Sequence, residues 1–123
     1  MWPQLLTLGR PTYAECGPIR VRGAVDYRNV PLLDDVALAR VARRFDVEGE
    51  NYLWQLEHHV RRVGTILTVI ADAAPGGVLV HCAAGKDRTG LIASLVLAIA
   101  GVDRKVIASD YAALSVGRSS ACA

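Results

Sequence analysis

The chain has 123 residues, of which 52% are hydrophobic, so it has the size of one domain and can bury a core. This composition excludes long disordered stretches, and a net charge of +2 is too small to indicate a nucleic-acid-binding protein. We expect a single domain over residues 1–123, with an irregular N-terminal lead over residues 1–18 and a loose tail over residues 115–123.

The N-terminus and the cysteines exclude further classes of protein. The first ten residues lack the basic and long apolar segments of a signal peptide, and charges interrupt every apolar stretch before a membrane span is complete. The three cysteines, at positions 16, 82 and 122, are far apart and form no CxxC pattern, which argues against a disulfide framework or a metal site. We therefore expect a cytoplasmic protein without a transmembrane segment, metal or cofactor, whose oligomeric state the sequence leaves open.

Hydrophobic periodicity predicts a succession of strands and helices. Apolar and polar residues alternate after residue 18, as in a strand with a bend at Gly23, whereas apolar residues three and four apart mark the helices that follow. The predicted elements are a strand within residues 19–33, helices over residues 36–45 and 52–74, a strand over residues 78–81, and helices over residues 88–100 and 104–114.

The segment "VLVH", residues 78–81, and the helix that follows it are predicted to be the most buried elements of the fold. It is short, continuous and apolar, which is typical of a strand buried on both faces. The next helix is apolar nearly all round, so we expect it to be buried centrally and to end at Gly101. Asp103 can then cap a last helix in which Ile107, Tyr111 and Leu114 face inward. This order of elements predicts an α/β layered domain, in which ligands bind at the carboxyl ends of the strands.

The loop between this strand and the next helix has the composition of an anion-binding site. Cys82 ends the strand and Arg88 opens the helix. The residues after Cys82 are small and leave backbone N–H groups accessible; they are Ala83, Ala84 and Gly85. A helix N-terminus binds anions through its N–H groups and its dipole, and the Arg88 guanidinium can hold two oxygens of a phosphate.

The positive field of this loop activates the cysteine. Comparable environments lower the pKa of a thiol to about 3.5–7.5, so we expect Cys82 to be a thiolate at neutral pH. The Thr89 hydroxyl can donate a hydrogen bond to this sulfur, and a ring N–H of His81 can fix the loop through backbone carbonyls. A thiolate beneath an anion site predicts attack on phosphorus, which gives a cysteinyl-phosphate that water hydrolyses.

The ten residues "HCAAGKDRTG" carry a family resemblance. They fit the pattern His-Cys-x5-Arg-Thr and resemble the protein tyrosine phosphatase superfamily, most closely its bacterial and fungal tyrosine phosphatases of the lipid-and-protein type. The resemblance extends more loosely over residues 25–114. It implies a three-layer domain with a small, mostly parallel sheet flanked by helices. Since the chain is short for this family, we expect a truncated or divergent copy.

The resemblance also implies roles for the loop residues. Cys82 matches the nucleophile, Arg88 the phosphate-binding arginine, and Thr89 the hydroxyl that assists the thiolate and the turnover of the intermediate. The residues that match the phosphate loop are Ala83, Ala84, Gly85, Lys86, Asp87 and Arg88. The implied activity is hydrolysis of phosphomonoesters, namely phosphotyrosine and also phosphoinositides.

An aspartate on a separate loop protonates the leaving oxygen in this family. The segment "VPLLDD" offers Asp34 as the first candidate for this general acid and Asp35 as the second. Either residue could instead serve only as the cap of the helix over residues 36–45.

Two further loop residues have more than one explanation. Lys86 raises the local potential and suits multiply phosphorylated substrates such as phosphoinositides, although a solvated loop lysine explains it equally well. Asp87 is unexpected beside a phosphate because its charge repels the ligand. Its carboxylate could hold Lys86, hold a backbone N–H group or orient a water molecule.

Two other functions stay open on the sequence alone. A chain that lacks parts of the family's fold could bind phosphorylated ligands without turning them over. A sulfur-transfer or arsenate-reducing protein also places a cysteine in an anion loop, but the Arg-Thr pair and the lack of a nearby resolving cysteine argue against it. The sequence does not distinguish phosphotyrosine, phosphoserine or phosphothreonine, and phosphoinositide substrates.

Overall fold

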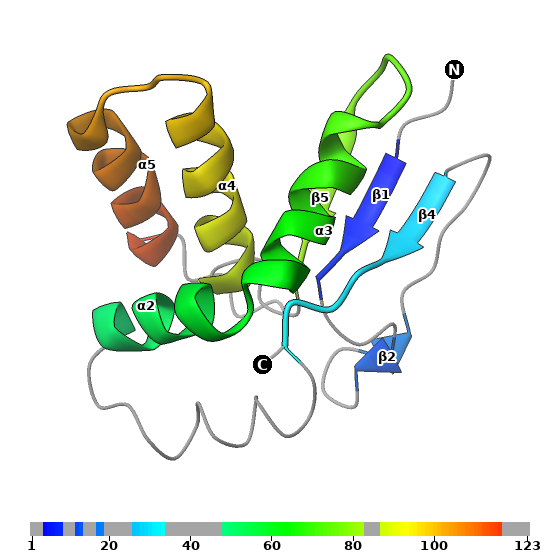
Figure 1. Cartoon of the computed structure of the whole chain (residues 1–123), viewed down its shortest axis with the longest axis horizontal. Coiled ribbons are helices and arrows are strands. Elements are labelled where there is room, and N and C mark those ends of the chain that lie inside the picture. Colours follow the sequence, from blue (N-terminus) through cyan, green and yellow to red (C-terminus); the bar gives the residue numbers. More distant parts are fainter. Residues whose placement is uncertain are drawn as a thin grey trace.

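The computed structural model describes residues 4–8, 12–13, 17–18, 26–33, 48–82 and 87–116. Figure 1 shows helices packed beside a small sheet. The elements are β1 (Gln4–Thr7), β2 (Thr12–Tyr13), β3 (Gly17–Pro18), β4 (Asp26–Asn29), α2 (Glu48–His58), α3 (Val60–Ala71), β5 (Val78–His81), α4 (Asp87–Ile99) and α5 (Arg104–Val116). The predicted helix over residues 36–45 lies outside the described residues.

Three strands form a parallel sheet in the order β4-β1-β5, which confirms the predicted α/β class with a parallel sheet. The strand predicted within residues 19–33 is β4. The central strand, β1, falls within residues 1–18, where the sequence predicts an irregular lead. That prediction fails at β1 because "QLLT" shows no alternation, and a short central strand is defined by its neighbours on both sides. Strands β2 and β3 form a separate antiparallel pair.

The core lies on one face of this sheet. Leu6 on β1 aligns with Val80 on β5, so the two side chains point to the same face, where Leu6 is fully buried. Ile66 of α3 and Ile92 of α4 complete the centre of this core. Leu79, which points to the opposite face, is 64% exposed. The prediction that residues 78–81 are buried on both faces is therefore wrong for the described part of the chain, because the helices described there pack on the face that carries Val80.

The helix predicted over residues 52–74 consists of two helices that change direction at His59. The His59 backbone has φ −124° and ψ 31°, outside the helical range, yet hydrogen bonds of helical spacing continue across it. His59 N donates to Gln55 O and Val63 N donates to His59 O, each at 3.0 Å. Figure 1 shows the result: α3 runs along the sheet, while α2 crosses below α4 and α5.

Helices α4 and α5 form a hairpin whose ends match the prediction. Gly101 follows α4 with φ +80°, and Asp103 Oδ1 accepts a hydrogen bond of 2.8 Å from Lys105 N at the start of α5. Gly90, Leu91 and Ile92 of α4 are buried, but Ile99 near its end is 73% exposed. The prediction of a helix buried along its whole length is thus correct only for the half beside the sheet.

No helix among the described residues is both long enough and apolar enough to cross a membrane.

Two glycines allow a matched test of this backbone. Replacing Gly101 by Ala should lower the free energy of unfolding by about 1–2 kcal/mol, because a positive φ is strained for any residue with a Cβ atom. Replacing Gly64, inside α3, by Ala should raise it by about 0.5–1 kcal/mol, because a Cβ there meets no atom within 4 Å and alanine favours helix. Urea denaturation followed by circular dichroism measures both changes. Shifts of the same sign would contradict the assigned backbone conformations.

Candidate active site

The candidate nucleophile, Cys82, is the first residue after β5 and is only 4% exposed. The surrounding backbone holds it at the carboxyl edge of the sheet. Leu8 N donates to His81 O at 2.9 Å, and Leu32 N donates to Leu8 O at 3.1 Å. The segment that leaves β1 is therefore bonded on one side to the residue before the thiol and on the other to the segment that leaves β4, at the edge where an α/β domain binds ligands.

The hydroxyl of Thr89, in the first turn of α4, connects this thiol to the helix. Thr89 Oγ1 accepts a hydrogen bond of 2.9 Å from Cys82 N and donates one of 3.1 Å to Cys82 Sγ. The predicted contact between the hydroxyl and the sulfur is therefore present. A hydrogen bond donated to sulfur stabilises the thiolate relative to the thiol.

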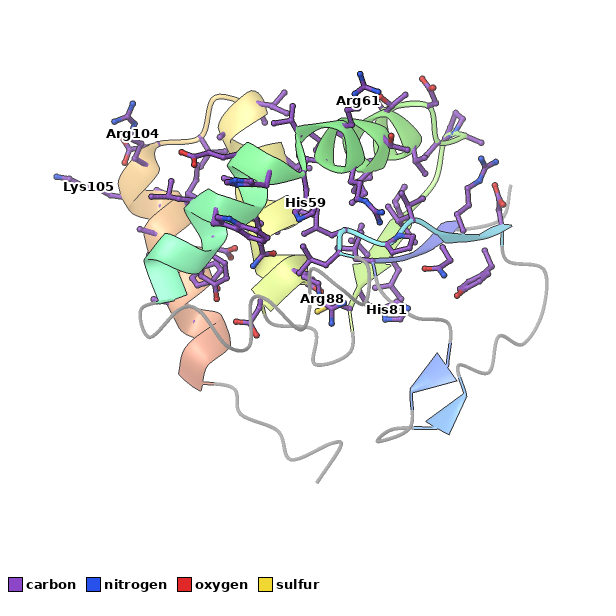
Figure 2. All side chains as sticks on the ribbon, turned by 60° about the horizontal axis from the view of Figure 1, so that its bottom comes forward. His59, Arg61, His81, Arg88, Arg104 and Lys105 are labelled. Atoms are coloured by element: carbon purple, nitrogen blue, oxygen red, sulfur yellow. The ribbon has the colours of Figure 1, made fainter. Side chains whose placement is uncertain are left out.

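His81 and Arg88 lie on either side of the thiol in sequence. His81 Nδ1 is 3.2 Å from Cys82 O, so the ring donates to this carbonyl when the proton is on Nδ1. The hydrogen bond predicted for His81 is thus present. Arg88, the second residue of α4, is half-buried. In the view of Figure 2, His81 and Arg88 are both seen toward the lower side of the molecule, away from Arg61, Arg104 and Lys105.

The remaining residues of the predicted site are outside the described residues. They are Ala83, Ala84, Gly85 and Lys86 of the phosphate loop and the two candidate acids, Asp34 and Asp35. Their roles stay predictions.

Asp87 begins α4, and its side chain bonds to a tyrosine that the sequence did not single out. Tyr52 on α2 donates a hydrogen bond of 2.7 Å to Asp87 Oδ1, and Tyr111 on α5 donates one of 2.6 Å to the Tyr52 hydroxyl oxygen. The two tyrosine rings meet edge to face with centroids 5.8 Å apart. Of the three partners considered for Asp87 from the sequence, none was a tyrosine.

The hydroxyl of Tyr52 stays protonated. Burial raises the pKa of Tyr52 far above its usual range, and the hydrogen bonds with Tyr111 and Asp87 raise it further. The hydroxyl therefore remains a donor to Asp87 at any working pH. Two features of the sequence point to this pair. The hydroxyl of a buried tyrosine needs a hydrogen-bond partner, and the sequence leaves the partner of Asp87 open. Because the two residues are 35 positions apart, local spacing in the sequence does not reveal their contact.

The described residues contain no group of three or more histidine, cysteine or acidic side chains that could hold a metal ion. What they bring together is a buried thiol, a hydroxyl bonded to it and an arginine at a helix N-terminus. This arrangement can bind a tetrahedral oxyanion and attack its central atom.

Replacing Thr89 by Val tests the hydroxyl bridge without changing side-chain shape. Alkylation of Cys82 by iodoacetamide, followed from pH 4 to pH 8, should slow by about tenfold on the acidic side of the profile, where the thiol form competes, because a hydrogen bond to a charged group contributes about 1.5–3 kcal/mol. Thr89→Ser keeps the hydroxyl and should stay within about twofold of the wild-type rate. Peptide mass spectrometry separates Cys82 from the other two cysteines. Equal rates for the Val and Ser variants would show that the bridge does not activate the thiol.

Comparison with known proteins identifies the family. A model described as the tyrosine phosphatase family matches residues 14–121. A tyrosine-protein phosphatase of Nostoc commune is 39% identical over 90 residues, which are 71% of this chain and 31% of that protein. The triple specificity protein phosphatase PtpB of Mycobacterium tuberculosis is 49% identical over 51 residues, which are 42% of this chain and 18% of that protein. The chain thus spans less than a third of either relative's length. Because the family model covers well over half of it, the chain belongs to the tyrosine phosphatase family.

Proposed function

We propose that this chain hydrolyses phosphomonoesters with Cys82 as the nucleophile. The observation that carries the proposal is the Thr89 hydroxyl, which bonds to both the backbone N and the sulfur of Cys82 at the junction of β5 and α4. It fixes the sulfur at the N-terminus of a helix, where a phosphate dianion is attracted by the helix dipole and by Arg88.

The proposed reaction has two steps. In the first, the Cys82 thiolate attacks phosphorus, a P–S bond forms, and the bond from phosphorus to the ester oxygen breaks as that oxygen takes a proton from the general acid. In the second, water attacks the cysteinyl-phosphate and gives its proton to the same carboxylate, so that inorganic phosphate leaves and the thiolate returns. Arg88 and the loop N–H groups hold the phosphate oxygens, and Thr89 stabilises the departing thiolate.

Asp34 is the proposed general acid. Leu33, its neighbour, is 4% exposed and belongs to the same core cluster as Cys82. Leu32 and His81 are both bonded to the Leu8 backbone. Leu33, one residue before Asp34 in sequence, therefore lies near the edge of the sheet that carries the thiol. Asp35, one position further on, is the second candidate.

Phosphotyrosine is the proposed substrate. A thiol with only 4% exposure is reached more easily by a phosphate at the end of an aromatic ring than by one on a short serine side chain. The name of one relative, a tyrosine-protein phosphatase, agrees with this choice, whereas the other is named a triple specificity protein phosphatase. Phosphoinositides are the second class, supported by Lys86 in the loop. Comparing rates on phosphotyrosine peptides, phosphoserine peptides and phosphoinositides decides between them.

Hydrolysis of p-nitrophenyl phosphate tests the cysteine mechanism. Replacing Cys82 by Ser should reduce kcat by more than about a thousandfold, because the hydroxyl is a far weaker nucleophile. Arg88→Lys should cost about a hundredfold, because a point charge cannot reproduce the two-pronged contact. Arg61→Lys, on the far side of the molecule in Figure 2, is the matched control and should change nothing. Equal rates for wild type and Cys82→Ser would overturn the mechanism, and phosphate binding without any turnover would support a binding module instead.

The pH dependence of kcat identifies the acid. A general acid must carry its proton in the enzyme–substrate complex, so the rate falls as pH rises through its pKa. Asp34→Asn should lose this basic limb, and its rate should drop more on phenyl phosphate than on p-nitrophenyl phosphate, whose leaving group needs less protonation. Asp35→Asn should keep the limb. Loss of the limb in the Asp35 variant alone would assign the role to Asp35.

A further inference from the structure

Three side chains from three helices meet at the first residue of α4. Tyr111 on α5 donates to the Tyr52 hydroxyl at 2.6 Å, and Tyr52 on α2 donates to Asp87 Oδ1 at 2.7 Å. The ring contact between the tyrosines is independent of these hydrogen bonds and holds both hydroxyls in place. We name these three residues the tyrosine–aspartate chain. No side chain of the three is needed as nucleophile, acid or phosphate ligand in the proposed reaction.

The Asp87 carboxylate occupies a position where its charge conflicts with the substrate. It lies in the first turn of α4, next to Arg88, and this helix end is where the phosphate is expected to bind. A carboxylate that turned toward the ligand would repel a dianion and would compete with it for Arg88 and the helix dipole. The conflict is removed if the carboxylate is held in another direction.

The tyrosines hold the carboxylate on the other side of the helix from the thiol. In Figure 1, α5 lies on one side of α4 and β5, which ends at the residue before Cys82, lies on the other. The bond to Tyr52 directs Oδ1 toward α2 and α5. Tyr111 strengthens this bond, because a hydroxyl that accepts a hydrogen bond becomes a better donor. Burial, which raises the pKa of Tyr52, keeps the donor protonated.

We infer that Tyr52 and Tyr111 are positioning residues that hold the Asp87 carboxylate away from the bound phosphate and so set the affinity of the site for the phosphoryl group. This inference rests on the proposed function, since it concerns the anion bound at that site.

Binding of inorganic phosphate to the full chain, measured by calorimetry, tests the inference. Tyr52→Phe should raise the Kd for phosphate by about tenfold, because the released carboxylate can approach the dianion. In a chain that already carries Asp87→Asn, the same Tyr52→Phe change should alter the Kd by less than about twofold, because no repelling charge is left. Tyr111→Phe should act in the same direction as Tyr52→Phe but more weakly. Tyr27→Phe, on β4 and outside the chain of hydrogen bonds, is the control and should leave the Kd unchanged.

The rescue by Asp87→Asn separates positioning from a merely structural role. If Tyr52→Phe weakens phosphate binding equally in the wild-type and Asp87→Asn backgrounds, the tyrosine only supports the fold and the inference is wrong. It is also wrong if neither tyrosine variant changes the Kd. Thermal unfolding identifies a variant that fails to fold; should Tyr52→Phe do so, Tyr111→Phe, which keeps the Tyr52–Asp87 contact, is compared in the same two backgrounds.

Failure of this inference differs from failure of the proposed function. A wild-type chain that neither binds phosphate nor hydrolyses p-nitrophenyl phosphate would contradict both the proposed function and this inference. A wild-type chain that does both, with an unchanged Kd in the tyrosine variants, removes the inference alone.

Discussion

A single hydroxyl group determines the geometry of the site. Thr89 Oγ1 accepts from the backbone N of Cys82 and donates to its sulfur, so it joins the end of β5 to the first turn of α4. Because both ends of the loop are fixed, the sulfur has a defined position relative to the helix axis and therefore relative to the helix dipole. Leu91 and Ile92, buried directly after the first turn, anchor the helix in the core. The rigidity of the junction thus comes from the hydroxyl bridge together with the packing of α4 in the core.

The charges at this junction need a second restraint. The helix N-terminus and Arg88 attract an anion, but the negatively charged carboxylate of Asp87 lies in the same turn. Two uncharged groups restrain the carboxylate: the Tyr52 hydroxyl donates to Asp87 Oδ1, and the Tyr111 hydroxyl donates to Tyr52. Neither adds a charge that would alter the field at the proposed phosphate site. A lysine or arginine in their place would neutralise Asp87 but would also add a competing cation near the ligand.

Local spacing in the sequence correctly predicted the contacts and helix ends that involve residues close together in the chain. The Thr89–Cys82 contact, the end of α4 at Gly101 and the Asp103 cap of α5 all connect residues close in sequence. Strand β1 was missed because its identity comes from pairing with β4 and β5, which lie far along the chain. The exposed side of β5 was missed because an apolar run indicates strand but not how many faces are covered. The break at His59 was missed because helical hydrogen bonds continue across it, so the periodicity hardly changes.

The tyrosine–aspartate chain also bears on when the site becomes functional during folding. The Thr89–Cys82 contact spans seven positions, whereas the contacts of Tyr52 with Asp87 and with Tyr111 span 35 and 59. Closing such long loops costs entropy that is recovered only when α2, α4 and α5 have docked. A partly folded chain can therefore form the strand–helix junction, with its thiol and arginine, before the Asp87 carboxylate is restrained. The proposed affinity for a phosphoryl group would then arise only with complete tertiary structure, which would couple ligand binding to the folding of the whole domain.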